Sequence, residues 1–383
     1  MVKTSYPKEI QIFFEEVKEK IRDSLNPDFI LIAGSFGKES WLYSGEKLIS
    51  DFEFVFVCEK RWSLKKKKQL LKSLNIDYVY DISLKGYLKD NIKQKVISNY
   101  SSKNPGYISL DYFDTFNNPR FLYIKKDEIL DIKCTVDEIP IWEAWRLYVN
   151  RMGDVLNLMC SSNSDQQNIN YYWLKIFEST ADSYCIVNRI YQKNISERLD
   201  IFNKELIESD EDLSEKCKTS FPIIQKAIKA RNEHNLLLFD INVNKNDCII
   251  IINSWMEYFE KKLAKQEQML IFDRKDFFSS YLVNRTLQKK YLGFNYRYNI
   301  LVSNLIRLIF HPYLLNLNFK WYNLNLSWRH IILLNVSSLF YEQNLKMENY
   351  RESKNIMSKL VSKKSINDND RIQIILNYWK ILR

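Results

Sequence analysis

The sequence predicts an α/β N-terminal domain, built on a small mixed sheet with helices, followed by an all-α C-terminal domain. Over about the first 139 residues, short apolar runs alternate with helical spacing, whereas from Trp142 onward the periodicity is mostly helical. Pro140 lies where the sequence pattern changes from alternating to mostly helical. The length of 383 residues exceeds the usual size of one domain. We therefore expect domains at residues 1–139 and 140–383.

The first part of the chain alternates helix-like and strand-like segments. Apolar residues at i, i+3, i+4 and i+7 predict a helix over Ile10–Leu25, and similar spacing predicts one over Leu64–Leu74. Short apolar or β-rich runs predict strands at Phe29–Ala33, Phe52–Cys58 and Ile76–Ile82. This alternation is the basis for the α/β assignment.

Two more strands are expected at Tyr107–Phe113 and Arg120–Ile124, separated by the turn-like Asn117, Asn118 and Pro119. A loop is expected at Ser161–Asn170. The predicted helices of the second half are Trp142–Met159, Tyr171–Tyr191, Phe221–Arg231, Ile249–Leu263 and further segments near the C-terminus.

Composition and charge limit the class of protein without choosing a partner. A hydrophobic content of 46% and a charged content of 27% exclude a disordered or collagenous chain. The formal charge of +10 suits a polyanionic partner such as nucleic acid, a phosphorylated substrate or an anionic membrane surface. The run Lys65–Lys68 is interpreted as a solvated helix face in preference to a phosphate-attracting patch.

Cysteines and apolar segments point to a cytoplasmic protein. Six scattered cysteines without a CxxC pair are expected to be free thiols in a reducing compartment. The N-terminus has no apolar stretch suited to a signal peptide, and no uninterrupted apolar segment of about 20 residues predicts a transmembrane helix.

Glycine is the most informative residue, because only 7 occur in 383 positions and Gly34, Gly37 and Gly45 fall within twelve of them. Gly34 and Gly37 lie in the segment GSFGKES, which follows the predicted strand that ends at Ala33, and Gly45 lies in the loop expected after this segment. Glycines after a strand allow positive φ and close approach of backbone N–H groups, so phosphate is the natural ligand. Ser35 shares this turn.

Asp51 and Glu53 add a second signal. Side chains at i and i+2 of a strand point to the same face, and two carboxylates there favour a cation; hard oxygen ligands suggest magnesium. A third carboxylate usually completes such a site. Asp77 is the first choice because it lies in the next predicted strand, and Asp81 and Asp111 remain alternatives.

These motifs carry a resemblance to a known family. GSFGKES followed by SDFEF resembles the nucleotidyltransferase superfamily named after DNA polymerase beta. The helical segments WEAWRLYVNRMGDVL and YYWLKIFESTADSYCI are similar to those of uncharacterised nucleotidyltransferase-domain proteins of bacterial surface-polysaccharide clusters. The resemblance implies an enzyme that uses magnesium to transfer a nucleoside monophosphate from an NTP, such as ATP, to a hydroxyl, with pyrophosphate release.

The resemblance also implies roles for individual residues. Gly34 and Ser35 would bind the NTP phosphates, Asp51 and Glu53 would bind two magnesium ions, and Asp77 would be the third ligand and candidate base. Glu53 departs from the more common Asp. The remaining nucleotide-binding candidates are Gly37, Lys38 and Ser50, with turn capping an alternative for Ser50.

Two alternatives stand beside this enzyme. One is a catalytically silent nucleotide-binding or scaffold protein with the same fold, and the other is a basic nucleic-acid-binding protein. The acceptor can be a sugar, a glycan precursor, a small molecule or RNA. In the helical half, Arg146 and Arg151 are candidates for phosphate contacts, although a salt-bridge network within the helices is the favoured interpretation.

Overall fold

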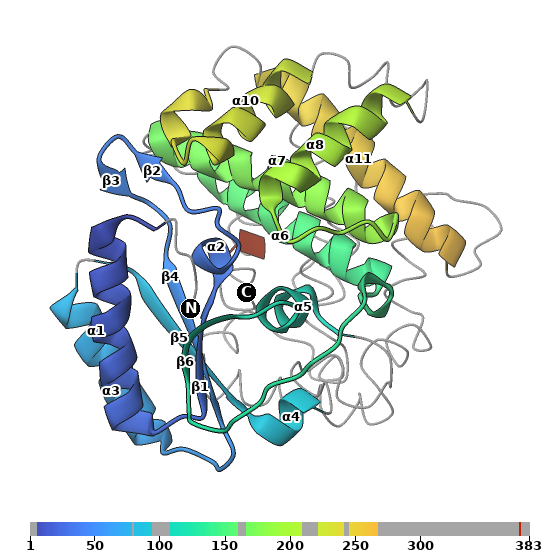
Figure 1. Ribbon diagram of the computed structural model, residues 1–383. Coiled ribbons are helices and arrows are strands. Elements are labelled where there is room, and N and C mark those ends of the chain that lie inside the picture. Colours follow the sequence, from blue (N-terminus) through green and yellow to red (C-terminus); the bar gives the residue numbers. More distant parts are fainter. Residues whose placement is uncertain are drawn as a thin grey trace, which may run out of the picture. The chain divides into compact units, whose positions relative to one another are not determined.

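Figure 1 shows a computed structural model of the chain, which describes residues 6–78, 80–93, 108–159, 166–208, 221–240, 245–266 and 375–376. The chain divides into two compact units. The first consists of Met1–Ile139, Gln192–Glu197 and Ala230–Leu236, and the second of Pro140–Tyr191, Arg198–Lys229 and Leu237–Arg383.

The first unit contains the predicted small mixed sheet. Its strands are β1 (Phe29–Ala33), β4 (Phe52–Cys58), β5 (Ile82–Leu88) and β6 (Arg120–Ile124), in the order β5-β4-β1-β6. β1 is antiparallel to β4 and β6, whereas β4 and β5 run parallel. The carboxyl end of β1 therefore lies beside the amino ends of β4 and β5.

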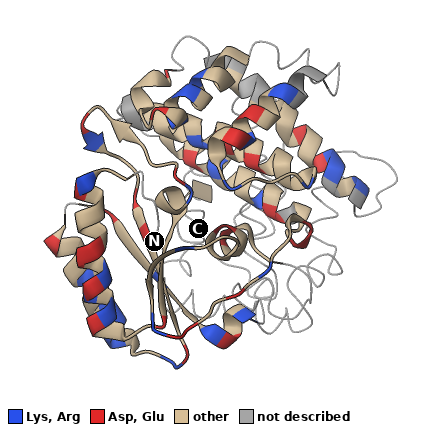
Figure 2. Ribbon diagram, viewed as in Figure 1, with Lys and Arg blue, Asp and Glu red and all other residues tan. Residues whose placement is uncertain are grey.

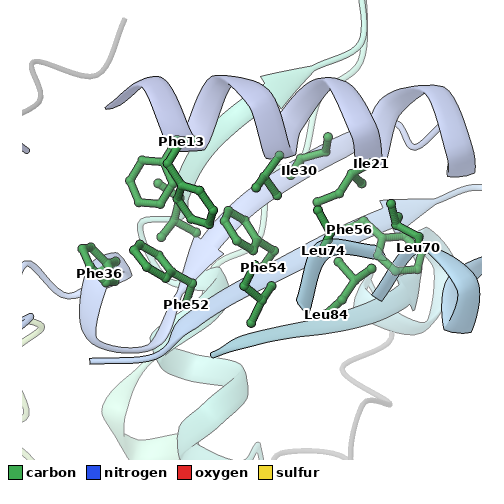
Figure 3. Close-up of a cluster of buried hydrophobic side chains, with 14 of the residues drawn as sticks. Phe13, Ile21, Ile30, Phe36, Phe52, Phe54, Phe56, Leu70, Leu74 and Leu84 are labelled. Carbon is green, nitrogen blue, oxygen red and sulfur yellow. The ribbon is translucent and has the colours of Figure 1, made fainter. Parts of the chain in front are cut away.

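Helices α1 (Lys8–Leu25) and α3 (Leu64–Asp77) cover one face of this sheet (Figures 1 and 3). The apolar stripe of α1 is buried, while acidic and basic residues alternate on its exposed side (Figure 2). The core between the layers is largely aromatic. Its labelled members in Figure 3 are Phe13, Ile21, Ile30, Phe36, Phe52, Phe54, Phe56, Leu70, Leu74 and Leu84.

Helix α5 (Leu110–Phe116) packs against the opposite face, where Tyr87 meets Phe116 with 5.6 Å between ring centroids. The strand expected at Tyr107–Phe113 is therefore wrong in its described part. Ser109 begins the helix instead, because its hydroxyl accepts a hydrogen bond from the Tyr112 N–H at 3.2 Å.

The strand expected at Ile76–Ile82 is also wrong. α3 continues to Asp77, and β5 begins only at Ile82. The Asn75 side chain closes the connection, since its amide contacts both the N–H and the carbonyl of Ile82, at 3.1 and 3.4 Å. This side-chain bridge replaces the backbone pairing that a strand here would have made.

A short hairpin and several small elements complete the first unit. β2 (Tyr43–Ser44) and β3 (Lys47–Leu48) pair around Gly45, whose φ of +62° suits a tight turn. The hairpin replaces the loop that the sequence predicts after GSFGKES. The short helices are α2 (Gly34–Gly37), α4 (Lys89–Lys93) and η1 (Val136–Glu138).

After Pro140 all described elements are helical. They are α6 (Ile141–Met159), α7 (Gln166–Val187), α8 (Ile195–Glu208), α10 (Phe221–Asn232), η3 (Leu236–Leu238) and α11 (Lys245–Gln266). The loop expected at Ser161–Asn170 is wrong over its last five residues, which begin α7. Of the helices expected near the C-terminus, only residues 375–376 are described, and these are helical. None of the described helices is long and apolar enough to cross a membrane.

Candidate functional site

The Gly-Ser turn follows β1 directly and forms the short helix α2. Gly34 has a φ of +59°, in the left-handed region that favours glycine. A Cβ added there would lie 2.5 Å from Oε1 of Glu53, which is paired with Ala33 across β1 and β4. The absence of a side chain at position 34 thus lets the Glu53 carboxylate lie directly against the turn. The phosphate-turn and carboxylate motifs of the sequence meet here.

Ser35 and Gly37 shape the same turn. The carbonyl of Ser35 accepts the Ser40 N–H at 2.8 Å, and within the described chain its hydroxyl has no hydrogen-bond partner. Gly37 approaches the backbone of β1, because a Cβ there would lie 2.7 Å from the Ile32 carbonyl oxygen. Gly37 therefore has a packing role that does not require a ligand.

Ser50 supports the hairpin loop. Its buried hydroxyl accepts the Leu42 N–H at 2.9 Å, and the Ile49 N–H donates to the Leu42 carbonyl at 3.0 Å. These bonds fix the chain immediately before Asp51. They agree with the capping alternative, while a contact from Ser50 to nucleotide stays a prediction.

Asp51 lies beside Asp81 at the amino ends of the parallel strands β4 and β5. The Phe52 N–H donates to the Asp81 carbonyl at 2.9 Å, and Phe52 pairs in register with Ile82. Alternation along the strands puts Asp51, Glu53 and Asp81 on one face of the sheet. Among the described residues, neither the Asp51 nor the Asp81 carboxylate has a hydrogen-bond or ion-pair partner.

Asp77, the first choice for the third carboxylate, lies elsewhere. It is the last residue of α3, and its Oδ2 lies 2.7 Å from Lys20 Nζ on α1 and 3.3 Å from the Ser73 hydroxyl. The hydrogen bond from Lys20 is the main cause that holds the pKa of this exposed carboxyl below its usual value. Since α3 covers the other face of the sheet, the reason for placing Asp77 beside Asp51 is wrong.

Glu53 and Asp111 share a lysine that the sequence analysis did not single out. Lys85 Nζ, on β5, lies 3.0 Å from Glu53 Oε2 and 3.2 and 3.3 Å from the two Asp111 carboxylate oxygens. Asp111 belongs to the first turn of α5. The alternation of β5, which points Lys85 to the same face as Glu53, is the signal by which sequence reasoning would have found it.

The carboxylates perturb both basic and phenolic neighbours. Burial opposes the charge of Lys85, but Asp111 and Glu53 outweigh it, so the pKa of Lys85 is raised. Burial raises the pKa of Tyr87 to about 12, with a further contribution from Asp111. Tyr87 therefore remains protonated, and Lys85 charged, across the physiological pH range.

A second group of side chains combines three cations with two carboxylates, and two of its members, Lys38 and Glu39, directly follow α2. Lys38 Nζ lies 2.5 Å from Asp114 Oδ2, and Arg120 forms an ion pair with Glu39. Burial lowers the pKa of Lys193, and the nearby positive charges of Arg120 and Lys38 lower it further. Cations this close to one another favour an anion.

Two segments distant in the sequence belong to this unit, and sequence reasoning missed both. Lys193 donates to the Asn118 carbonyl. The imidazole of His234 stacks on Trp41 with 4.1 Å between centroids, its Nδ1 lies 2.9 Å from the Trp41 carbonyl, and buried Arg231 donates to the Ser40 carbonyl. No local pattern connects residues so far apart in the chain.

The remaining basic candidates have intramolecular partners or lie on another layer. Arg146 makes two hydrogen bonds to Glu143, at 2.9 and 2.7 Å, and Arg151 makes one to Asp154 at 3.0 Å, as expected for a salt-bridge network within the helix. Lys65, Lys66 and Lys68 are exposed at the start of α3. They share the layer of α3 and not the face that carries Glu53.

The donor atoms at the sheet edge suit a hard cation. In the described parts of the chain, no three His, Cys, Asp or Glu side chains converge as a preformed metal centre. Magnesium does not require one, because it keeps several waters and is usually bound by one or two carboxylates together with substrate phosphates. Asp51, Asp81 and Glu53 supply ligands of that kind.

Neither a protein-family model nor a curated protein sequence matches this chain.

Proposed function

We propose that the protein is a magnesium-dependent nucleotidyltransferase, which transfers a nucleoside monophosphate from an NTP to a hydroxyl acceptor. The observation that carries the proposal is the contact of the Gly34 turn with Glu53, at the same sheet edge as Asp51 and Asp81, whose carboxylates have no partner among the described residues. A phosphate-binding turn and hard oxygen ligands together are what phosphoryl transfer requires.

In this proposal the turn and the neighbouring cations bind the triphosphate. Gly34 and Ser35 present backbone groups and a hydroxyl to the phosphates. Lys38, Arg120 and Lys193 neutralise phosphate charge, exchanging their contacts with Asp114, Glu39 and the Asn118 carbonyl for contacts with the ligand.

The carboxylates hold the cation and the acceptor proton. Asp51 and Glu53, with Asp81 as the third carboxylate, would bind Mg²⁺, which when bound stabilises negative charge on the reacting phosphate. The acceptor hydroxyl oxygen forms a bond to the α-phosphorus while the bond from that phosphorus to the β-phosphate oxygen breaks. Pyrophosphate leaves with the bonding electrons, and the exposed Asp81 takes the hydroxyl proton.

The proposed organisation is an α/β domain over residues 1–139 that carries the site and a helical domain over residues 140–383 that selects the acceptor. The segments Gln192–Glu197 and Ala230–Leu236 add to the first of these. The acceptor is a sugar, a glycan precursor, a small molecule or RNA, and the proposed compartment is the cytoplasm.

The test is pyrophosphate release with each NTP and a pool of hydroxyl acceptors, followed by product mass. Asp51→Asn is expected to lower turnover by more than about 100-fold, because it removes a cation ligand. Asp77→Asn is the matched control, an identical change at an exposed carboxylate outside the site, and should leave turnover within about twofold. Equal turnover in the two variants would disprove the proposal.

A second candidate function is a catalytically silent nucleotide-binding protein. The contact between Lys85 and Glu53 favours it, because a cation ligand of the proposed enzyme already has a positive partner. NTP binding without pyrophosphate release under any combination of metal and acceptor would support this candidate over the enzyme.

A further inference from the structure

The ammonium group of Lys85 lies where two carboxylates from different elements converge. Glu53 comes from β4 and Asp111 from α5, and three of their oxygens lie within 3.0–3.3 Å of Lys85 Nζ. The side chains of Lys85 and Glu53 are 37% and 22% exposed, so water screens this pair only in part. An arrangement of carboxylate oxygens around one positive centre is also how proteins bind hard cations.

Lys85 differs from an ordinary surface ion-pair partner because the carboxylate that it binds belongs to the candidate site. Glu53 is the residue whose carboxylate lies against Gly34, and it shares a sheet face with Asp51. A cation ligated by Glu53 at this edge would lie close to the Lys85 charge, and the two positive charges would repel each other.

We propose that Lys85 is a tethered cation that competes with a divalent metal ion for Glu53 and Asp111. Metal binding at this edge displaces the ammonium group from Glu53, and the energy of that displacement weakens the affinity for metal. Lys85 thereby sets the metal concentration at which the site is filled. This inference rests on the proposed function, since it concerns the cation site of the same sheet edge.

The experiment measures Mn²⁺ binding to the full chain without nucleotide, by titration with detection of free Mn²⁺ in electron paramagnetic resonance. Lys85→Met should bind Mn²⁺ about tenfold more tightly than the wild type, because the competing charge is gone. Lys85→Arg keeps the charge and should stay near the wild type.

Lys89→Met is the matched control. Lys89 is a neighbouring lysine that also forms an ion pair with a glutamate, Glu128, so the change removes the same charge from the same kind of contact. It should leave Mn²⁺ affinity within about twofold. In a Glu53→Gln background, the gain from Lys85→Met should be smaller, because only Asp111 remains as a ligand for which they compete.

Circular dichroism and thermal unfolding identify any variant that fails to fold. If Lys85→Met is one of them, Lys85→Gln, which also removes the charge, takes its place and should show the same gain. Unchanged or weaker Mn²⁺ affinity in folded Lys85→Met, or an equal gain in Lys89→Met, would overturn the inference while leaving the proposed function intact. Wild-type protein that binds no Mn²⁺, with or without a non-hydrolysable NTP analogue, would overturn both.

Discussion

Gly34 meets two structural requirements, because its backbone is left-handed and its lack of a side chain leaves space for the Glu53 carboxylate. Any side chain at this position meets both the strain of φ near +59° and a contact of 2.5 Å with Glu53 Oε1. The carboxylate would have to move from the turn for a Cβ to fit. The arrangement of the site therefore requires a residue without a side chain at position 34.

Gly34→Ala should therefore weaken binding of a non-hydrolysable NTP analogue by more than about tenfold, as measured by calorimetric titration. Gly45→Ala is the matched control, because Gly45 has a φ of +62° but no atom within 4 Å of an added Cβ. Both variants should lose about 1 kcal/mol of stability from backbone strain. Equal loss of analogue binding in both variants would contradict the contact with Glu53.

Cys58 gives a residue-level prediction about pH. Burial raises the pKa of its thiol to about 11, and Asp28 adds to the effect. Since only the thiolate reacts with iodoacetamide, labelling of Cys58 in the native protein should accelerate about tenfold per pH unit from pH 8 to pH 10. In urea the rate should level off above about pH 8.5. Peptide mass mapping measures the labelling rate of Cys58 in the native protein and in urea. The same dependence of that rate on pH in the two conditions would contradict the buried position of Cys58.

At the scale of elements, the aromatic core fixes α1 on the sheet. Phe13 is 5% exposed and packs against Phe52 with 4.5 Å between centroids, whereas its neighbour Ile12 is 52% exposed. The helical stripe of the sequence predicts this difference. The partners across the core follow from the alternation of β4, in which Phe52, Phe54 and Phe56 share one face.

Phe13→Ala should lower the free energy of unfolding by about 3–5 kcal/mol, because it leaves a cavity between α1 and β4. Ile12→Ala, one position away, should change it by less than about 0.5 kcal/mol. Urea unfolding followed by tryptophan fluorescence measures both. Similar losses from the two substitutions would show that α1 is docked through another face.

The elements that sequence reasoning predicted correctly have strong periodicity, and those that it missed depend on contacts between layers. β1 and β4 are continuous apolar runs, so their positions were predictable to the residue. IDYVYDI has β-like composition, yet Lys20 binds Asp77 and Glu16 binds the Tyr78 hydroxyl, which stabilises the helical end of α3 against α1. Those partners lie 57 and 62 residues away, beyond any local pattern.

The candidate site shows the same division. Gly34, Ser35, Asp51 and Glu53 could be proposed from the sequence because two short motifs carry them. The choice among Asp77, Asp81 and Asp111 depended on where β5 begins. The predicted strand began six residues too early, which placed Asp77 in that strand, whereas it is the last residue of α3. Lys85 was missed because no strand was predicted over Ile82–Leu88, so the alternation that points Lys85 to the face of Glu53 was not considered.

At the scale of the whole molecule, the first unit is assembled from three separate parts of the chain. The segment Ala230–Leu236 contacts the loop that follows the Gly-Ser turn, through the His234 imidazole on Trp41 and through the Tyr43 N–H, which donates to the His234 carbonyl at 2.8 Å. The loop that leads to Asp51 is thus fixed by residues about 190 positions away.

His234→Ala should increase hydrogen exchange of the peptide 41–50, because it removes the ring stack and the Nδ1 contact with the Trp41 carbonyl. The combined loss should be about 1–3 kcal/mol of local stability. Glu233→Ala changes the preceding exposed residue and should leave the exchange of that peptide unchanged. Unaltered exchange in His234→Ala would mean that this segment does not hold the loop.

The most direct test of a metal-nucleotide site at this sheet edge is calorimetric titration of a non-hydrolysable NTP analogue, with and without Mg²⁺. Binding should require Mg²⁺ and should fall by more than about tenfold in Glu53→Gln, but not in Glu128→Gln, whose carboxylate pairs with Lys89 instead. Binding that is independent of Mg²⁺ and unchanged in Glu53→Gln would contradict the assignment of the site.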